Sequence, residues 1–359
     1  MGRRISRMPA FVGVGILLIT AAACAQNGSA SPSAGLGCGA GFRQVFSSAV
    51  SDGADHGDLF SVYFAVSLPD GSVAISYNPN SPGAGDQPKA TPDRLVEVGA
   101  DGTLTRVELP VLAGARVDDS VIPLVAAPEG TLYLYDGPSD RVVALDPEGG
   151  WSVVAALSRG SAGSGPLAAL GPNGELYLGT VSSVLRVEAD GALTRIAGNA
   201  TVQGQDIQGS QPPLVGLPLP ATQVNLPLLN GLAVAPDGAI FMTAGSLILR
   251  LGGGLLTEAA NSLSLAGVVS RSTGQSDVVF RGLSVAADGS LFTAAIGDTV
   301  QVQHIVGLAT AETLQAGPET VTPGHPDVYA VNNGAVVGAG SGMTLLVTRR
   351  NGTVCAYDS

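Results

Sequence analysis

One unit with two turns recurs along this chain and constrains its fold more than any other feature. Each copy opens with a Pro-Asp-Gly step or a close variant between two short apolar runs, and glycine supplies the positive φ that a tight hairpin turn needs. The first turns of the successive copies end at Gly71, Gly130, Gly174, Gly238, Gly289 and Gly334. Self-similarity at a spacing of about 40 to 50 residues is typical of propellers and solenoids.

A third strand and a second turn follow the hairpin of each copy. The second turn is clearest at Asp101-Gly102 and Asp190-Gly191, and each of these leads into a fourth short strand. Four strands are the content of one propeller blade. Unrelated hairpins in a β-sandwich are the alternative. Because the same two turns recur in the same order, the sequence predicts an all-β fold, a six-bladed β-propeller of four-stranded blades.

A family resemblance appears in the middle of the chain. Residues 195–199 (RIAGN), a Gly/Pro/Gln-rich loop, and residues 229–241 (LNGLAVAPDGAIF) follow one another. This order resembles bacterial NHL-repeat β-propellers, closely in the second to fourth units and loosely elsewhere. The Asp-x-x-Asn-x-Arg-Val strand of that family is approached only at residues 136–142 (DGPSDRV). The resemblance implies the fold, whereas such propellers host both binding and a few lytic activities.

The first residues have the pattern of an export signal. Arg3, Arg4 and Arg7 precede an apolar stretch at 11–20, and three alanines stand before Cys24. We interpret residues 1–23 as a signal peptide, and the small residues before Cys24 resemble a bacterial lipobox in which that cysteine is lipidated. Ordinary cleavage beside a free cysteine is the alternative. Residues 24–37 then form a flexible tether, which predicts a lipid-anchored protein on the outer face of the cytoplasmic membrane, in the cell envelope.

Two further cysteines lie near the two ends of the predicted propeller domain, residues 38–359. We expect residues 43–46 to form an outer strand beside residues 353–357, because a propeller must close its ring. Cys38 and Cys355 would then be joined by a disulfide, which persists in exported proteins. Two free thiols are the alternative. One ring accounts for the whole domain, and we expect a monomer.

The charge of the chain excludes one class of partner. The formal net charge is −12, with 29 acidic and 17 basic residues. Nucleic-acid affinity depends on neutralising phosphates with basic side chains, so we expect no nucleic-acid partner.

Candidate site residues lie in loops, and none of them forms a catalytic motif. A nucleophile elbow, a His-Glu-x-x-His motif and a Walker loop do not occur in the sequence. The loop residues that we consider ligand-facing are His325, Asp118, Asp119 and Asp206. The spacing of Asp118, Asp119 and Glu129 does not support a lactonase-like metal trio. We predict no cofactor, and a divalent cation is the alternative.

These features favour a binding protein over an enzyme. We expect an exported propeller that acts as a binding or scaffolding module for a protein, peptide or glycan of the envelope, docked across the central depression. The alternative is a divalent-metal-dependent lactonase or lyase of the propeller class.

Overall fold

The fold is available from a computed structural model. It describes residues 42–47, 61–78, 94–99, 103–162, 165–199, 217–262, 265, 279–286, 288–296, 300–308, 310–314, 328–332, 344–349 and 353–358. The regular elements among these residues are β-strands, apart from two short 3-10 helices, η1 (Gly137–Ser139) and η2 (Ala221–Gln223). In this part of the chain no helix has the length and apolar character needed to span a membrane.

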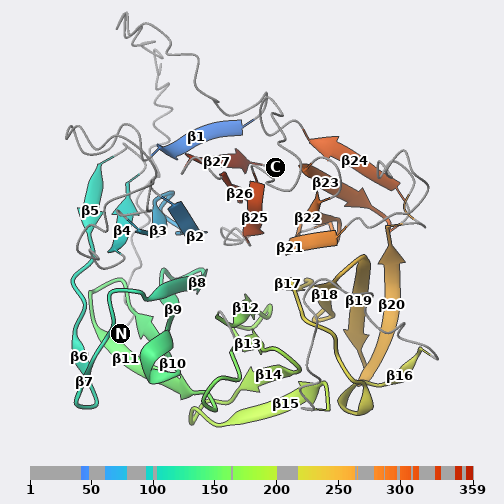
Figure 1. Ribbon diagram of the computed structural model, residues 1–359, viewed down its shortest axis with the longest axis horizontal. Coiled ribbons are helices and arrows are strands. Elements are labelled where there is room, and N and C mark those ends of the chain that lie inside the picture. The colour runs from blue at the N-terminus through green and yellow to red at the C-terminus, as the bar shows by residue number, and fades with distance from the viewer. Residues whose placement is uncertain are drawn as a thin grey trace, which may run out of the picture. The chain divides into compact units, whose positions relative to one another are not determined.

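The strands of the described segments form five four-stranded sheets, one five-stranded sheet and a separate hairpin (Figure 1). The first two sheets comprise β2 (Ser61–Ser67), β3 (Val73–Asn78), β4 (Arg94–Val98) and β5 (Leu104–Arg106), then β8 (Ile122–Ala126), β9 (Leu132–Asp136), β10 (Arg141–Leu145) and β11 (Trp151–Ala156). The next two comprise β12 (Leu167–Leu170), β13 (Leu176–Gly179), β14 (Val184–Val187) and β15 (Leu193–Ala197), then β16 (Leu219–Pro220), β17 (Gly231–Val234), β18 (Ile240–Ala244), β19 (Leu247–Gly252) and β20 (Leu255–Asn261). The last two comprise β21 (Val279–Val285), β22 (Leu291–Ile296), β23 (Val300–Val306) and β24 (Thr310–Leu314), then β25 (Val328–Asn332), β26 (Thr344–Arg349), β27 (Thr353–Asp358) and β1 (Phe42–Ser47). The hairpin comprises β6 (Val111–Leu112) and β7 (Ala115–Arg116).

The first strands of successive sheets pack on one another around a centre. Strand β2 contacts β8, β8 contacts β12, β12 contacts β17, and β17 contacts β21 (Figure 1). Strand β21 contacts β25, and β25 in turn contacts β2, which closes the circle of contacts. Within each sheet the consecutive strands pair antiparallel. Radial repetition of antiparallel sheets is the propeller architecture. The expected all-β propeller is therefore confirmed.

The last sheet takes one strand from each end of the chain. Strand β1 pairs antiparallel with β27, in the sheet order β1-β27-β26-β25. The expectation that residues 43–46 form an outer strand beside 353–357 is confirmed. Gln44 stands opposite Cys355 in this register. Cys38 lies outside the described residues, so its bridge to Cys355 stays a prediction, as do the lipidation of Cys24 and the boundaries of the leader and tether.

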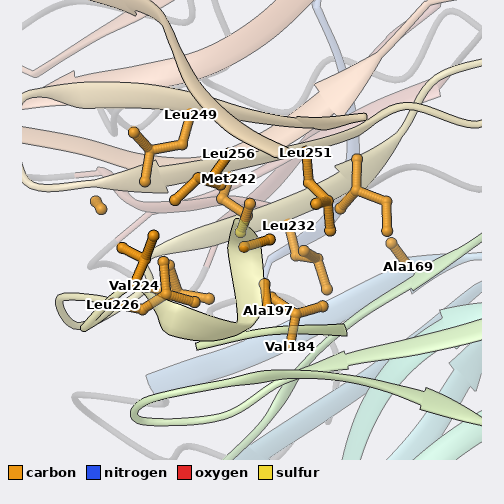
Figure 2. Packing of buried hydrophobic residues seen from close by; sticks show 14 residues of the cluster. Ala169, Val184, Ala197, Val224, Leu226, Leu232, Met242, Leu249, Leu251 and Leu256 are labelled. Carbon is orange, nitrogen blue, oxygen red and sulfur yellow. The ribbon is translucent and has the colours of Figure 1, made fainter. Parts of the chain in front are cut away.

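The core lies between neighbouring sheets, and strand alternation sends side chains to both sides. In β18, Ile240 and Met242 pack toward β12–β15, whereas Phe241 packs toward β21–β24. Figure 2 shows the first of these cores, where Met242, Leu249 and Leu256 meet residues such as Val184 and Ala197. Because the inner strands of a blade are covered on both faces, they carry mostly apolar residues on both sides. This explains why charged residues make up only 13% of the chain.

The turn after β15 depends on a glycine. Gly198 has a φ of +83°, and its N–H donates to the Ala221 carbonyl at 2.9 Å. A Cβ at this position would collide with the carbonyl oxygen of Ser182 and with the Ser183 backbone. Gly198 thus lets the long connection to the next sheet leave close to the loop between β13 and β14.

Candidate functional site

The two aspartates proposed from the sequence have local partners. The Asp118 carboxylate accepts hydrogen bonds from the backbone N–H and the hydroxyl of Ser120. An oxygen of Asp119 lies 3.7 Å from the Arg116 guanidinium. His325 and Asp206, the other proposed residues, lie outside the described residues. Asp118 and Asp119 therefore shape the loop before β8, and their position supplies no evidence of a ligand.

A metal trio of Asp118, Asp119 and Glu129 does not form. The two aspartates precede β8 and Glu129 follows it, so the five-residue strand separates them. A strand of this length spans about 17 Å. More generally, no three His, Cys, Asp or Glu side chains gather in a metal-binding arrangement within the described segments.

A buried ion pair fixes the loops beside Asp118. The side chains of Asp136 and Arg141 are 0% and 7% exposed, and Arg141 Nε donates to Asp136 Oδ2 at 2.8 Å. The same guanidinium donates to the carbonyls of Leu112 at 2.8 Å and Ala115 at 3.1 Å, which belong to the β6–β7 hairpin. Three satisfied donors explain how this arginine tolerates burial. Asp136 and Arg141 both belong to the 136–142 segment, and their ion pair gives them a structural role.

A tyrosine in the same sheet is also fully engaged. The Tyr135 hydroxyl donates to Asp140 Oδ1 at 2.9 Å. Burial raises the pKa of this phenol to about 12, and the Asp140 hydrogen bond and charge add to the effect. Tyr135 therefore stays protonated at neutral pH and acts as a hydrogen-bond donor that orders the loop.

A groove of about 820 Å³ opens between the sheet β8–β11 and the sheet β12–β15. This volume is in the range of small-molecule sites. One wall includes Tyr133, Val153 and Val154. The other wall comes from the two turns of the next sheet and the strand residues beside them: Asn173, Gly174, Glu175, Leu176, Arg186, Val187, Glu188, Ala189, Asp190 and Gly191.

The groove is acidic. Glu175, Glu188 and Asp190 line it beside a single basic residue, Arg186, whose Nη2 donates to Glu188 Oε1 at 2.8 Å. The hydrogen bond from Asn173 lowers the pKa of the Glu175 carboxyl. Hydrogen bonds from Thr194 and then Arg186 lower the pKa of Glu188. Both glutamates are therefore ionised at neutral pH, and the lining carries an excess of negative charge.

On the other wall of the groove, Tyr133 keeps its proton. Burial raises its pKa, and the charge of Glu129 adds to this. The phenol is therefore neutral where Tyr133 lines the groove. Sequence reasoning missed the groove because its residues are ordinary turn and strand formers, and only the packing of two sheets brings them together.

The comparisons with known proteins identify a fold. No family model matches the chain, and no curated protein is similar enough to match. A solved protein described as a putative gluconolactonase is 16% identical, with 89% of this chain and 92% of that chain covered and a TM-score of 0.51. A gluconolactonase from Xanthomonas campestris is 13% identical, with 83% and 87% covered and a TM-score of 0.50. A virginiamycin B lyase from Staphylococcus aureus is 13% identical, with 89% and 99% covered and a TM-score of 0.47.

At these identities the similarity shows the propeller fold alone. The NHL assignment expected from residues 195–241 receives no support from the family comparison, and it stays a resemblance.

Proposed function

We propose that this chain is a β-propeller enzyme that hydrolyses a lactone. The supporting observation is that a solved gluconolactonase and a solved protein described as a putative gluconolactonase share its fold over most of both chains, with TM-scores of 0.50 and 0.51. One fold hosts many functions, so this similarity supports a class of reaction and does not identify a substrate. It nevertheless gives the enzyme hypothesis more support than the binding hypothesis favoured by the sequence. The lyase, with a TM-score of 0.47, adds no support.

A divalent cation belongs to this hypothesis, but the described residues do not fit one. Asp118 is engaged by Ser120, Asp119 lies beside Arg116, and three suitable side chains do not gather within the described ranges. We therefore derive no catalytic step through a metal.

The experiment is a hydrolysis assay on the purified mature chain. A panel of five- and six-membered sugar lactones and alkyl lactones is followed by acid release, with and without Ca²⁺, Mg²⁺, Mn²⁺ or Zn²⁺. Elemental analysis of the same preparation measures the bound metal. We expect turnover of at least one lactone above the buffer rate. A flat response across the whole panel, with every cation tested, would contradict lactone hydrolysis.

A binding module is the second candidate, and the groove favours it. A volume of about 820 Å³ lined by ionised and aromatic side chains suits a polar ligand. In this proposal the propeller is held at the envelope by lipidated Cys24 and binds a protein, peptide or glycan there. Membrane fractionation of the wild type and of Cys24→Ala tests the anchor. We expect only the variant to appear in the soluble fraction, and equal distribution of the two would contradict the anchor.

We also propose that the ring has six blades. The five-stranded sheet contains four consecutive strands, β17 to β20, and the two-residue strand β16 is added at its edge. Counted as one blade, this sheet and the five four-stranded sheets of the described segments make six blades.

A further inference from the structure

Two Asn-Gly steps of this chain lie in opposite environments. Such steps begin at Asn27, Asn173, Asn230, Asn333 and Asn351. Of these, Asn173-Gly174 and Asn230-Gly231 lie in the part of the chain that the structure describes. An asparagine side chain is most open to attack by the next backbone nitrogen when the next residue is glycine, because glycine has no side chain and is free in its backbone angles.

The Asn173-Gly174 step is open to solvent. Both residues are exposed in the turn between β12 and β13. Gly174 has a φ of +85°, and a Cβ added there would meet nothing within 4 Å. The Gly174 N–H donates to the Gly171 carbonyl at 3.0 Å. An exposed turn opens locally at a much lower free-energy cost than a buried strand, so the Gly174 nitrogen can reach the Asn173 side chain.

The Asn230-Gly231 step is held in place by two neighbouring strands. Gly231 is buried at the start of β17, where an added Cβ would lie 2.6 Å from the carbonyl carbon of Gly282 in β21. The Asn230 N–H donates to the Thr243 carbonyl of β18 at 2.8 Å, and the Asn230 carbonyl accepts from the Gly282 N–H at 2.8 Å. The Gly231 nitrogen therefore reaches the Asn230 side chain only when β17 separates from these strands.

We propose that Asn173 is a site of spontaneous deamidation in the folded protein, and that the reaction adds a carboxylate to the lining of the acidic groove. The Gly174 nitrogen attacks Cγ of Asn173, so that a new C–N bond closes a cyclic imide. The bond from Cγ to Nδ2 breaks, and ammonia leaves with the proton of the Gly174 nitrogen. Water then opens the imide at either carbonyl and gives aspartate or isoaspartate at position 173. The net reaction consumes water and releases ammonia.

The product changes the surroundings of Glu175. In the unmodified chain the Asn173 backbone N–H donates to Glu175 Oε2 at 3.2 Å, and Asn173 Nδ2 donates to Glu175 Oε1 at 3.1 Å. The hydrogen bond from the Asn173 side chain is the largest cause of the lowered pKa of Glu175. Deamidation removes this donor and places a second carboxylate beside Glu175, so we expect the pKa of Glu175 to rise.

The test compares the two steps in the same molecule. The folded mature chain is incubated at alkaline pH in water enriched in heavy oxygen, so that only deamidation during the incubation introduces the label. Mass spectrometry of proteolytic peptides then gives the rate at each step. We expect Asn173 to deamidate at least about tenfold faster than Asn230, because each 1.4 kcal/mol needed to open β17 slows the reaction about tenfold.

The same incubation in urea is the control. Without the fold both asparagines precede an unhindered glycine, and we expect similar rates at Asn173 and Asn230. Equal rates in the folded chain would overturn the proposal. A difference that persists unchanged in urea would also overturn it, because the sequence and not the fold would then set the rates. Neither result depends on lactone hydrolysis, so this proposal and the proposed function fail separately.

Two variants test the consequence for the groove. Asn173→Asp carries the charge of the product, and Asn173→Gln keeps an amide and is the matched control. The pKa of Glu175 is measured in each by titration followed by nuclear magnetic resonance. We expect a clearly higher Glu175 pKa in Asn173→Asp than in Asn173→Gln, because only the former adds a like charge. Equal Glu175 pKa values in the two variants would contradict the effect of deamidation on the groove.

Discussion

Substitution of Gly198 by alanine tests how the turn after β15 is built. Two costs arise at this position. The φ of +83° is left-handed backbone, which costs a residue with a Cβ about 1 to 2 kcal/mol. The added Cβ also meets the backbone of Ser182 and Ser183, which must shift, and such overpacking costs about 1 to 3 kcal/mol.

One effect works in the opposite direction. Alanine restricts the unfolded chain more than glycine does, which stabilises the folded state by about 0.4 to 1 kcal/mol. The net expectation is a loss of about 2 to 4 kcal/mol in the free energy of unfolding. Since 1.4 kcal/mol is a factor of 10 in the equilibrium constant, the effect is well above measurement error.

Gly238→Ala is the matched control. Gly238 has a φ of +81°, but a Cβ there meets nothing within 4 Å. It therefore carries the backbone cost without the collision, and we expect a loss of about 1 kcal/mol or less. Urea unfolding followed by tryptophan fluorescence and circular dichroism gives both values, provided that the slope with denaturant is unchanged. Equal destabilisation by the two substitutions would refute the close approach of Gly198 to Ser182.

Three further predictions concern buried charge, acid stability and the thiols. Arg141→Met leaves the Asp136 carboxylate buried without its partner, so we expect the free energy of unfolding, measured in urea, to fall by about 3 to 5 kcal/mol. Proteolysis of the β6–β7 hairpin, which Arg141 also contacts, should become faster. A variant as stable as the wild type would contradict the stabilising role of this ion pair. Hydrogen bonds from Ser290 lower the pKa of the Asp288 carboxyl in the folded state. The folded chain therefore binds a proton at Asp288 more weakly than the unfolded chain does. The stability that the ionised carboxylate contributes is lost as the pH falls below the ordinary carboxyl pKa and through the lowered one. We therefore expect the unfolding midpoint of Asp288→Asn to decrease less than that of the wild type between about pH 5 and pH 2. Parallel pH curves for the two proteins would contradict this role of Asp288. If Cys38 and Cys355 are joined by a disulfide, neither cysteine of the non-reduced mature protein is alkylated. Detection by mass spectrometry of an alkyl label on both cysteines would exclude the bridge.

The architecture could be predicted from the sequence because it depends on local signals. Gly130, Gly174 and Gly238 all adopt the positive φ that their turns require. Each turn is bounded by strands whose residues suit burial on both faces. The pairing of β1 with β27 also followed from the sequence, since a ring leaves the last sheet in need of a strand from the other end of the chain.

The site could not be predicted in the same way. The groove depends on how the sheets β8–β11 and β12–β15 meet, and its lining residues are ordinary turn and strand formers that lie far apart in the sequence, from Tyr133 to Gly191. Their meeting becomes visible only when the packing of the two sheets is known. Asp118 and Asp119 were predicted to face a ligand because they precede the first strand of a unit and could project into the central channel. Asp118 instead caps its own turn through Ser120, a role that the short Asp-x-Ser spacing already allowed.

Hydrogen exchange of the backbone amides tests the closed ring most directly. Strand β1 has one partner strand, β27, and the two make up the outer half of the last sheet. If the ring is closed in this way, amides of residues 42–47 and 353–358 that lie in the β1–β27 ladder exchange slowly and open together, with similar protection. Exchange of residues 42–47 at the rate of a free chain, beside protected residues 353–358, would contradict the closure.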